Sequence, residues 1–289
     1  MSRARVTMHP LGRIDRRWIF LVIALSVIIP MILKLKIPTR PSPIVEHIFE
    51  KIEALPAGSK VLLSLDFAPS TVPESLPMSL ALTRHLLAKG HRVYLMTLWA
   101  TGPDMITRAV NVIKADFPEK VYGTDYVNLG YKAGNQGVIN SIAANFKTLF
   151  TADEAGTPID QIPMTKEIRN SGDFDLILCV GSGFPGLKEW IQFAGDRMNV
   201  PVAGGVTAVE APLLYPYYPR QLLGLMGGLQ GAAEFEAALV AKYPRFLENS
   251  EEAIKKMGPQ TVAHLVILAL IVVGNLAYFL GARPKGGRP

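Results

Sequence analysis

The segment from Gly181 to Gly186, GSGFPG, has the glycine spacing of loops that hold a dinucleotide pyrophosphate at the start of a helix. Glu210 follows the next expected strand, where an acid would hold a ribose. Two features oppose this chemistry. The loop comes after the fourth expected strand rather than the first, and Pro185 has no amide to donate to a phosphate. We therefore favour a tight turn from a strand into a helix. An anion or small-ligand site and a dinucleotide site stay open as alternatives.

Small and polar residues follow several expected strands, and in a parallel sheet these positions share one edge. Ligands bind beyond the carboxyl ends of such strands, where backbone amides at helix starts can hold an anion. Asp66 is the acid of most interest because it ends a buried strand, although an aspartate there more commonly caps the next turn. The candidate ligand-binding residues are Asp66, Ser70, Thr101, Gly181, Ser182, Gly183, Thr207 and Glu210.

No residue pattern indicates a catalytic or metal centre. Ser182 has glycines immediately before and after it, whereas a nucleophile elbow has them two positions away. The histidines show no triad or metal spacing, and the single cysteine, Cys179, excludes an intrachain disulfide. The adjacent acids Asp153 and Glu154 lie in a polar loop and are expected to be solvated. We name no catalytic residue, no metal ligand and no cofactor, and lean away from an enzyme.

The chain around the glycine loop alternates between strand and helix patterns. Short apolar runs predict strands at residues 61–67, 91–99, 125–131, 174–183 and 201–208. Apolar residues at helical spacing predict helices at residues 47–55, 73–90, 103–117, 135–150, 164–172 and 187–198. This alternation is typical of an open, mostly parallel, Rossmann-like three-layer α/β sheet, here with about five strands.

Two apolar segments bracket the predicted sheet. Residues 18–33 carry no charge, their apolar character continues to Ile37, and residues 262–281 also lack a formal charge. A helix of about 20 residues spans the ~30 Å hydrocarbon layer of a membrane. A cleaved signal peptide is the alternative for the first segment, but no small-residue cleavage site follows it. We predict transmembrane helices at residues 18–37 and 262–281, on either side of a domain of residues 38–260.

The positive charge belongs to the ends of the chain. The net charge is +6, residues 1–37 alone carry +6 and residues 282–289 carry +3, so the middle is mildly acidic. A nucleic-acid-binding face needs basic residues clustered on the folded domain, and we expect no nucleic-acid partner. Five arginines precede the first apolar segment. By the positive-inside rule the segments 1–17 and 282–289 are cytoplasmic, in an inner or plasma membrane. The domain is then extracytoplasmic, or periplasmic in a double-membrane bacterium.

Residues 211–246 have the composition of an interface. Three tyrosines alternate with prolines, and a helix rich in glycine is expected after them. Each glycine costs a helix about 1 kcal/mol relative to alanine, so close packing should compensate. Glycines four residues apart allow that approach, either to the domain's own sheet or to another subunit. The candidate interface residues are Tyr215, Tyr217, Tyr218, Gly224, Gly227, Gly228, Gly231 and, in the second apolar segment, Asn275.

The sequence supports two functions from different classes. The first is a non-catalytic structural or accessory subunit of an oligomeric membrane assembly, with the lipid bilayer and copies of itself or other membrane proteins as partners. The second is a membrane-tethered domain that binds a small ligand, a nucleotide or anion among them, or acts on it at the carboxyl edge of the sheet. An open α/β sheet hosts many functions, so the fold class does not choose between them. The lack of an acid–base or metal set favours the first.

Overall fold

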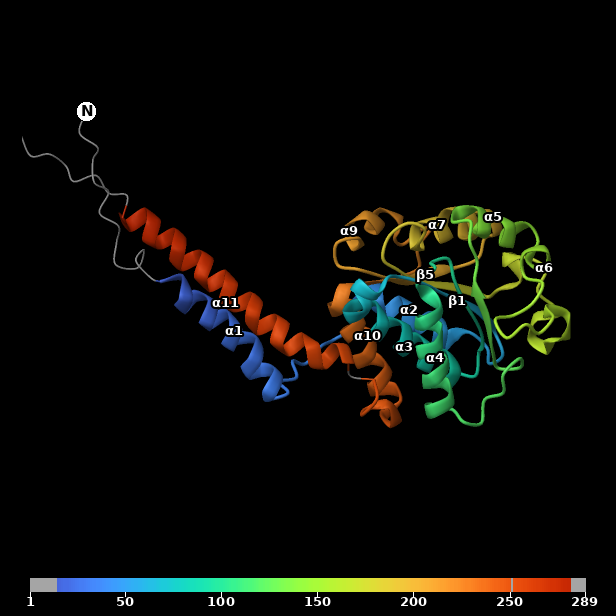
Figure 1. Cartoon of the computed structure of the whole chain (residues 1–289), viewed down its shortest axis with the longest axis horizontal. Coiled ribbons are helices and arrows are strands. Elements are labelled where there is room, and N and C mark those ends of the chain that lie inside the picture. Colours follow the sequence, from blue (N-terminus) through green and yellow to red (C-terminus); the bar gives the residue numbers. More distant parts are fainter. Residues whose placement is uncertain (1–14, 251, 282–289) are drawn as a thin grey trace, which may run out of the picture. The chain divides into compact units, whose positions relative to one another are not determined.

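A computed structural model of the chain describes residues 15–250 and 252–281 (Figure 1). The chain divides into two units, which we describe separately. One is Pro38–Ile254, and the other consists of the segments up to Ile37 and from Lys255 onward. Most of the predicted cytoplasmic segment 1–17 and the whole predicted tail 282–289 lie outside the described residues.

The described part of the Pro38–Ile254 unit contains one sheet of six parallel strands. They are β1 (Lys60–Asp66), β2 (Arg92–Thr97), β3 (Tyr126–Tyr131), β4 (Leu176–Gly181), β5 (Val202–Val206) and β6 (Leu225–Gly227). Their order in the sheet is β3-β2-β1-β4-β5-β6. The chain therefore builds outward from β1, returns after β3, and builds outward again from β4. This Rossmann-like order creates a topological switch point between β1 and β4.

The two central strands explain why the sequence shows continuous apolar runs there. Every residue of β4 is buried, as expected for a parallel strand that is covered on both faces. Asp66, the last residue of β1, pairs in register with Gly181, the last residue of β4. The loops that follow these two strands therefore start side by side.

Helices cover both faces of the sheet (Figure 1). The helices that pack together on one face are α2 (Pro43–Ala54), α3 (Val72–Ala88), α4 (Gly102–Asp116) and α10 (Gly228–Lys242). On the other face α5 (Gln136–Ala144) packs with the helical segment that begins at α7 (Leu187–Trp190) and continues through α8 (Asp196–Met198). The short helices α6 (Phe146–Leu149) and α9 (Ala211–Leu214) lie in connecting segments. The predicted parallel, Rossmann-like α/β sheet is confirmed.

The strand count and one helix prediction were wrong in the same segment. The sheet has a sixth strand, β6, at Leu225–Gly227, inside the stretch for which we predicted a glycine-rich helix. The helix α10 begins only at Gly228. Three residues are too few to show an alternating or apolar pattern, so β6 is recognised only by its pairing with β5.

Two further helix predictions differ from the structure because polar side chains bind nearby backbone groups. The predicted helix at 164–172 is replaced by 3-10 turns, and the Asn170 side chain accepts a hydrogen bond from the Gly172 amide. The predicted helix at 135–150 is two helices, α5 and α6. The Asn145 side chain accepts from the amides of Lys147 and Thr148 and begins the second helix.

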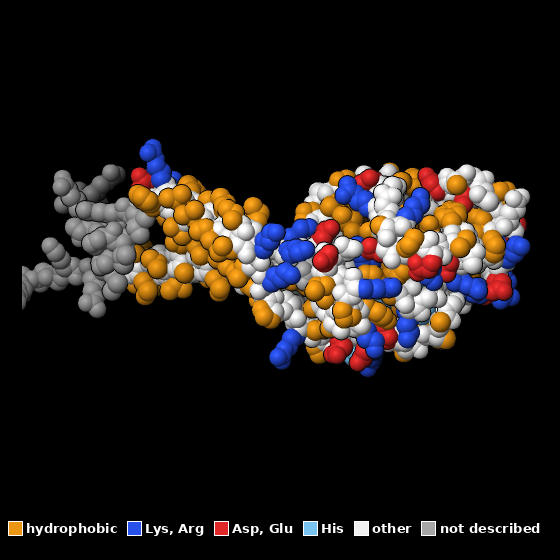
Figure 2. All heavy atoms as spheres, turned by 90° about the horizontal axis from the view of Figure 1, so that it is seen from below, with side chains coloured by type: hydrophobic (Ala, Val, Ile, Leu, Met, Phe, Trp, Pro, Cys, Tyr) orange, Lys and Arg blue, Asp and Glu red, His pale blue; other side chains and the backbone are white. Residues whose placement is uncertain are grey.

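The second unit contains α1 (Arg16–Ile32) and most of α11 (Glu252–Gly281), which lie side by side (Figure 1). A Cβ atom on Gly258 would overlap the carbonyl oxygen of Leu35, so the two backbone segments touch there. Most of the large apolar side chains that are exposed in the described residues belong to this unit, as the orange surface in Figure 2 shows.

Among the described residues, α11 is the only helix long and apolar enough to cross a membrane, over Glu252–Phe279. It begins at Glu252 rather than at residue 262, so part of the expected linker is helical. The first predicted span, 18–37, is helical only as far as Ile32, and α1 has 17 residues. By its length and composition α11 could cross a membrane, and the second span is a proposal.

Candidate functional site

The loops after β1, β4 and β5 surround a cleft of about 680 Å³ at the carboxyl edge of the sheet. Thr71 and Glu74, at the start of α3, form one side of it. The cleft therefore lies beside the switch point between β1 and β4, the position at which open α/β sheets bind ligands. Its volume is that of a small-molecule site.

Four of the eight predicted ligand-binding residues line this cleft, namely Ser182, Gly183, Thr207 and Glu210. They come from the β4–α7 loop and from the segment after β5, which are adjacent because β4 and β5 are paired. The other four predicted residues do not line the cleft. Asp66 and Gly181 are buried at the strand ends, Ser70 is exposed in the turn after β1, and the Thr101 hydroxyl donates to the Phe67 carbonyl at 3.4 Å.

The glycines of the 181–186 segment are explained by close packing. A Cβ atom on Gly186 would overlap the Gly183 carbonyl oxygen, and one on Gly181 would lie 3.4 Å from the Gly186 Cα. Gly183 has a φ of +150°, which residues with side chains rarely adopt, and it packs against the Trp99 ring. The Trp99 indole N–H donates to the Pro185 carbonyl at 2.7 Å. The segment is a tight turn from β4 into α7.

Backbone amides that a bound phosphate would need are already used in this turn. The Gly186 amide donates to the Glu189 carboxylate at 2.8 Å, and the Ser182 amide donates to the Asp66 carbonyl at 3.1 Å. Pro185 has no amide hydrogen. A carboxylate of the chain itself therefore occupies the place of an anion at the start of the helix.

The charged residues that line the cleft are mostly acidic: Glu74, Glu189 and Glu210, against one cation, Lys188. Glu74 accepts a hydrogen bond from the Ala208 amide at 2.9 Å. Glu74 and Glu189 each have a backbone partner, so both carboxylates are held in place. The arrangement disfavours a ligand whose main feature is a negative charge.

Glu210 differs from the other two acids because part of its carboxylate has no partner. Its Oε2 atom is buried and accepts no hydrogen bond in the described residues. Burial, together with the negative charge of Glu189, raises the pKa of Glu210 to about 7. This carboxyl group therefore changes charge close to neutral pH.

Large apolar side chains form the rim of the cleft. Phe184 is 59% exposed, Val209 is 86% exposed and Leu213 is 70% exposed. Groups of exposed apolar side chains are a common feature of binding surfaces. These three residues were not predicted from the sequence, because apolar residues in loops and short helices do not recur with the regular spacing of a strand or a long helix.

Two of the acids could have been found from the sequence. Glu74 and Glu189 are each the third residue of a helix, α3 and α7. Thr71 and Glu74 have the Thr-x-x-Glu spacing of a capping box, and Glu189 follows Gly186 at the same spacing, although glycine has no side chain to complete such a pair. Helix starts at the carboxyl edge of a parallel sheet bring such residues to the ligand side.

Asp66 has a structural position beneath the cleft. It is fully buried, and burial raises its pKa, although four hydrogen-bond donors oppose this shift. The donors are the Ser64 hydroxyl at 2.7 Å, the Leu98 amide at 2.7 Å, the Trp190 indole at 3.1 Å and the Cys179 thiol at 3.4 Å. Asp66 thereby ties together β1, the end of β2, β4 and α7, and it positions the loops of the cleft.

The predicted interface glycines pack closely against atoms of their own domain. A Cβ atom on any of them would come within 3.0 Å of an atom of the same domain. The nearest atom belongs to Ile44 for Gly224, to Ala211 for Gly227, to Ala208 for Gly228 and to Met226 for Gly231. The close approach that the sequence indicated is therefore to the domain's own elements.

The predicted interface tyrosines differ from one another. The Tyr217 hydroxyl accepts from the Gln192 side chain at 2.9 Å, and the Tyr218 hydroxyl lies 2.8 Å from the His47 Nδ1. Tyr215 is 53% exposed and follows α9. The Asn275 amide donates to the Ile271 carbonyl of its own helix at 2.9 Å.

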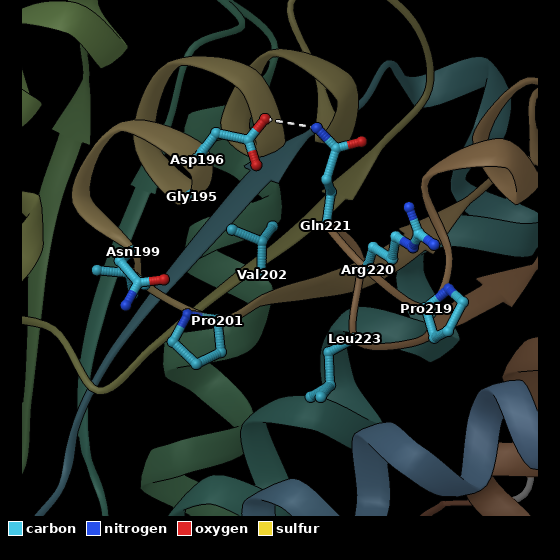
Figure 3. A pocket seen from close by; sticks show the side chains of 10 residues that line it. Gly195, Asp196, Asn199, Pro201, Val202, Pro219, Arg220, Gln221 and Leu223 are labelled. Atoms are coloured by element: carbon cyan, nitrogen blue, oxygen red, sulfur yellow. Dashed lines mark hydrogen bonds between the residues drawn. The ribbon is translucent and has the colours of Figure 1, made fainter.

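A second hollow of about 310 Å³ lies at the opposite, amino end of β5 and β6 (Figure 3). It is bordered by Asn199 and Pro201 before β5 and by Arg220 and Gln221 before β6. The Gln221 amide donates to the Asp196 carboxylate at 2.7 Å along one side. This hollow gathers no loop from the carboxyl edge, so the larger cleft is the better candidate site.

No known protein family matches the chain, and none of the curated proteins matches it. Among solved structures, the chain is similar to the C-terminal domain of a glycosyl transferase group 1 family protein (LpcC) from Francisella tularensis. The identity is 9% and the TM-score 0.30, over 78% of this chain and 94% of that one. It is also similar to trehalose-6-phosphate synthase OtsA, at 10% identity and a TM-score of 0.32, over 92% of this chain and 48% of that one. The chain thus matches about half the length of OtsA. These TM-scores are too low to support a conclusion about function.

Proposed function

We propose that the chain is a membrane-anchored α/β domain that binds a small ligand in the cleft at the carboxyl edge of its sheet. The observation that carries this proposal is the cleft of about 680 Å³ beside the switch point, bordered by loops from three strands. This is the second of the two functions that the sequence supports. The close packing of the interface glycines within the domain removes one argument for the first.

The side chains of the cleft favour a ligand that combines an apolar body with a positively charged or hydrogen-bond-donating group. Phe184, Val209 and Leu213 offer apolar surface at the rim, and the acids that line the cleft, Glu210 among them, favour a donor or a positive charge. The Ser182 and Thr207 hydroxyls supply further polar groups. A nucleotide is disfavoured because the Gly186 amide already donates to Glu189.

We propose binding rather than catalysis as the role of the cleft. Glu210 has a pKa suited to acid–base chemistry, but no nucleophile pairs with a base at the rim. Among the described residues, no group of three or more His, Cys, Asp or Glu side chains is placed to hold a metal ion.

For the membrane arrangement we propose two spans, α1 and α11, with both termini cytoplasmic and the domain extracytoplasmic. The exposed apolar surface of α1 and its position beside α11 support the second span. A 17-residue helix is about 26 Å long at 1.5 Å per residue, close to the ~30 Å hydrocarbon layer. The arginines before α1 and the cations after residue 281 support the orientation.

Native mass spectrometry of the full-length protein, extracted from its own membrane in mild detergent, tests the binding proposal. We expect one chain with a small bound mass, which is lost in a Ser182→Leu, Thr207→Leu variant that fills the cleft. An Arg220→Leu variant alters only the second hollow and should keep the mass. A small mass that survives in the cleft variant would refute the site.

The accessory subunit is the second candidate, and one observation favours it. Val209, Leu213 and Tyr215 are exposed apolar side chains on and beside α9, a surface that a protein partner would cover. The same mass measurement separates the two functions. A stable complex with other polypeptides and no small ligand would favour the subunit.

A further inference from the structure

Four lysines lie at one end of the α1–α11 pair. Lys34 and Lys36 follow α1, Lys255 and Lys256 lie in the first turns of α11, and all four are exposed. The contact between Gly258 and the Leu35 carbonyl brings the two pairs together. Leu35 separates the first two lysines, and Lys255 precedes Gly258 by three residues, which places it on the same side of the helix.

These lysines stand where the apolar surface of the helix pair ends. The sequence has no Asp, Glu, Lys or Arg between Arg17 and Lys34, and none from residue 257 to residue 281. Over these stretches large apolar side chains are exposed on both helices, and Figure 2 shows blue side chains next to the orange surface. With the apolar stretch in hydrocarbon, the lysine end lies at the level of the lipid headgroups.

We propose that Lys34, Lys36, Lys255 and Lys256 form a binding surface for the phosphate groups of anionic phospholipids. An ammonium group binds a phosphate by charge-assisted hydrogen bonds, and here the segment after α1 and the first turns of α11 each contribute two lysines. A headgroup at this place contacts both helices at once, with its acyl chains along the apolar surface. In the sequence the acids within residues 251–258 and 33–37 are Glu251 and Glu252, so with four lysines these stretches carry a net charge of +2. The inference rests on the proposed membrane anchoring and is independent of the cleft.

The test uses full-length protein in nanodiscs of phosphatidylcholine with and without phosphatidylglycerol. The relative association of spin-labelled forms of the two lipids is the readout. We expect the protein to prefer phosphatidylglycerol several-fold. The preference should disappear in the variant Lys34→Gln, Lys36→Gln, Lys255→Gln, Lys256→Gln and return when all four are arginine. A matched control changes Lys114, Lys147, Lys166 and Lys242 of the other unit to Gln, and should keep the preference.

The outcomes separate this inference from the anchoring on which it rests. Release of the protein from its membrane by carbonate extraction would refute the anchoring itself. An anchored protein with equal association of both lipids, or a preference that the four-lysine variant keeps, would overturn the inference alone. Loss of the preference on adding inorganic phosphate at constant ionic strength would also overturn it, because the surface would then be a free-anion site.

Discussion

The Gly186 amide donates a 2.8 Å hydrogen bond to the carboxylate of Glu189, three residues further along the same turn. This contact decides how the GSGFPG segment is used. The spacing that elsewhere cradles a phosphate here holds a side chain of the chain itself, and that side chain lines the ligand cleft. The cleft is therefore acidic at the position where a nucleotide site would be positive.

Replacing Glu189 with Gln should lower the pKa of Glu210 from about 7 towards its ordinary range, because the Glu189 charge contributes to the upward shift. The Gln side chain can still accept from the Gly186 amide and only the charge at the helix start is lost, so the free energy of unfolding should fall by less than about 1 kcal/mol. Titration of the Glu210 carboxyl by ¹³C NMR and urea unfolding measure the two effects. An unchanged Glu210 pKa would mean that burial alone sets it.

Replacing Glu210 with Gln should stabilise the domain at pH 8 by about 1–2 kcal/mol, a figure reduced for partial solvent exposure. The folded-state pKa of about 7 lies above the ordinary 4.5. As the pH rises from 4.5 to 7 the unfolded chain loses this proton first, so the wild type loses stability over that range. At pH 4 the two proteins should unfold at the same urea concentration. A variant that is less stable at pH 8 would contradict the unpartnered position of Glu210.

Acid should destabilise the domain between pH 6.5 and 4 through His85. This side chain is fully buried, its Nε2 lies 2.9 Å from Glu53, and its Nδ1 has no partner. Burial lowers the pKa of His85 to about 4, against an opposing effect of Glu53. As the pH falls the unfolded chain takes up the proton first, so the free energy of unfolding falls by about 3 kcal/mol between the ordinary pKa of 6.5 and the folded-state pKa of about 4.

Glu53, which contacts His85, affects stability over a different pH range, so the two contributions can be separated. Burial would raise the pKa of Glu53, but hydrogen bonds from Tyr243, His85 and Lys89 lower it to about 2. The stability that Glu53 contributes is therefore present above pH 4.5 and is lost as the pH falls towards 2. In a His85→Phe variant the free energy of unfolding should fall less steeply as the pH decreases from 6.5 to 4. An unchanged slope would assign the effect elsewhere, for example to His91, whose pKa burial also lowers.

Replacing Gly231 with Leu should destabilise the domain by about 3 kcal/mol, because the side chain would collide with backbone atoms of Met226. Gly137 is the matched control, since a Cβ atom there meets nothing within 4 Å. Gly137→Ala in α5 should raise stability by up to ~1 kcal/mol. Urea unfolding measures both variants. A Gly231→Leu protein with native stability but a smaller native mass would restore the subunit-interface interpretation.

Much of the fold follows from local patterns. Buried parallel strands need continuous apolar residues, so β1, β2, β4 and β5 are visible in the sequence. The apolar segment that becomes α11 is visible for the same reason. The breaks at Asn145 and Asn170 were missed because they depend on single side chains that bind the backbone.

The candidate site was predictable only in part. Ser182, Gly183, Thr207 and Glu210 were identified from their places after strands, because the carboxyl ends of parallel strands share an edge. Asp66 was identified by the same rule, yet it lies under the cleft. Its donors Cys179 and Trp190 are more than one hundred residues away in the chain, and their positions follow from the order of the strands.

The sequence by itself determined the alternation of strands and helices, the apolar ends of the chain and the location of its positive charge, because these depend on residues close to one another along the chain. The tertiary structure alone decided which loops meet at the cleft, that the Gly186 amide donates to Glu189, and that Gly224, Gly227, Gly228 and Gly231 pack within the domain. These features depend on strand order and on contacts between distant segments. The burial and charge of a side chain are set by neighbours that the linear pattern does not specify.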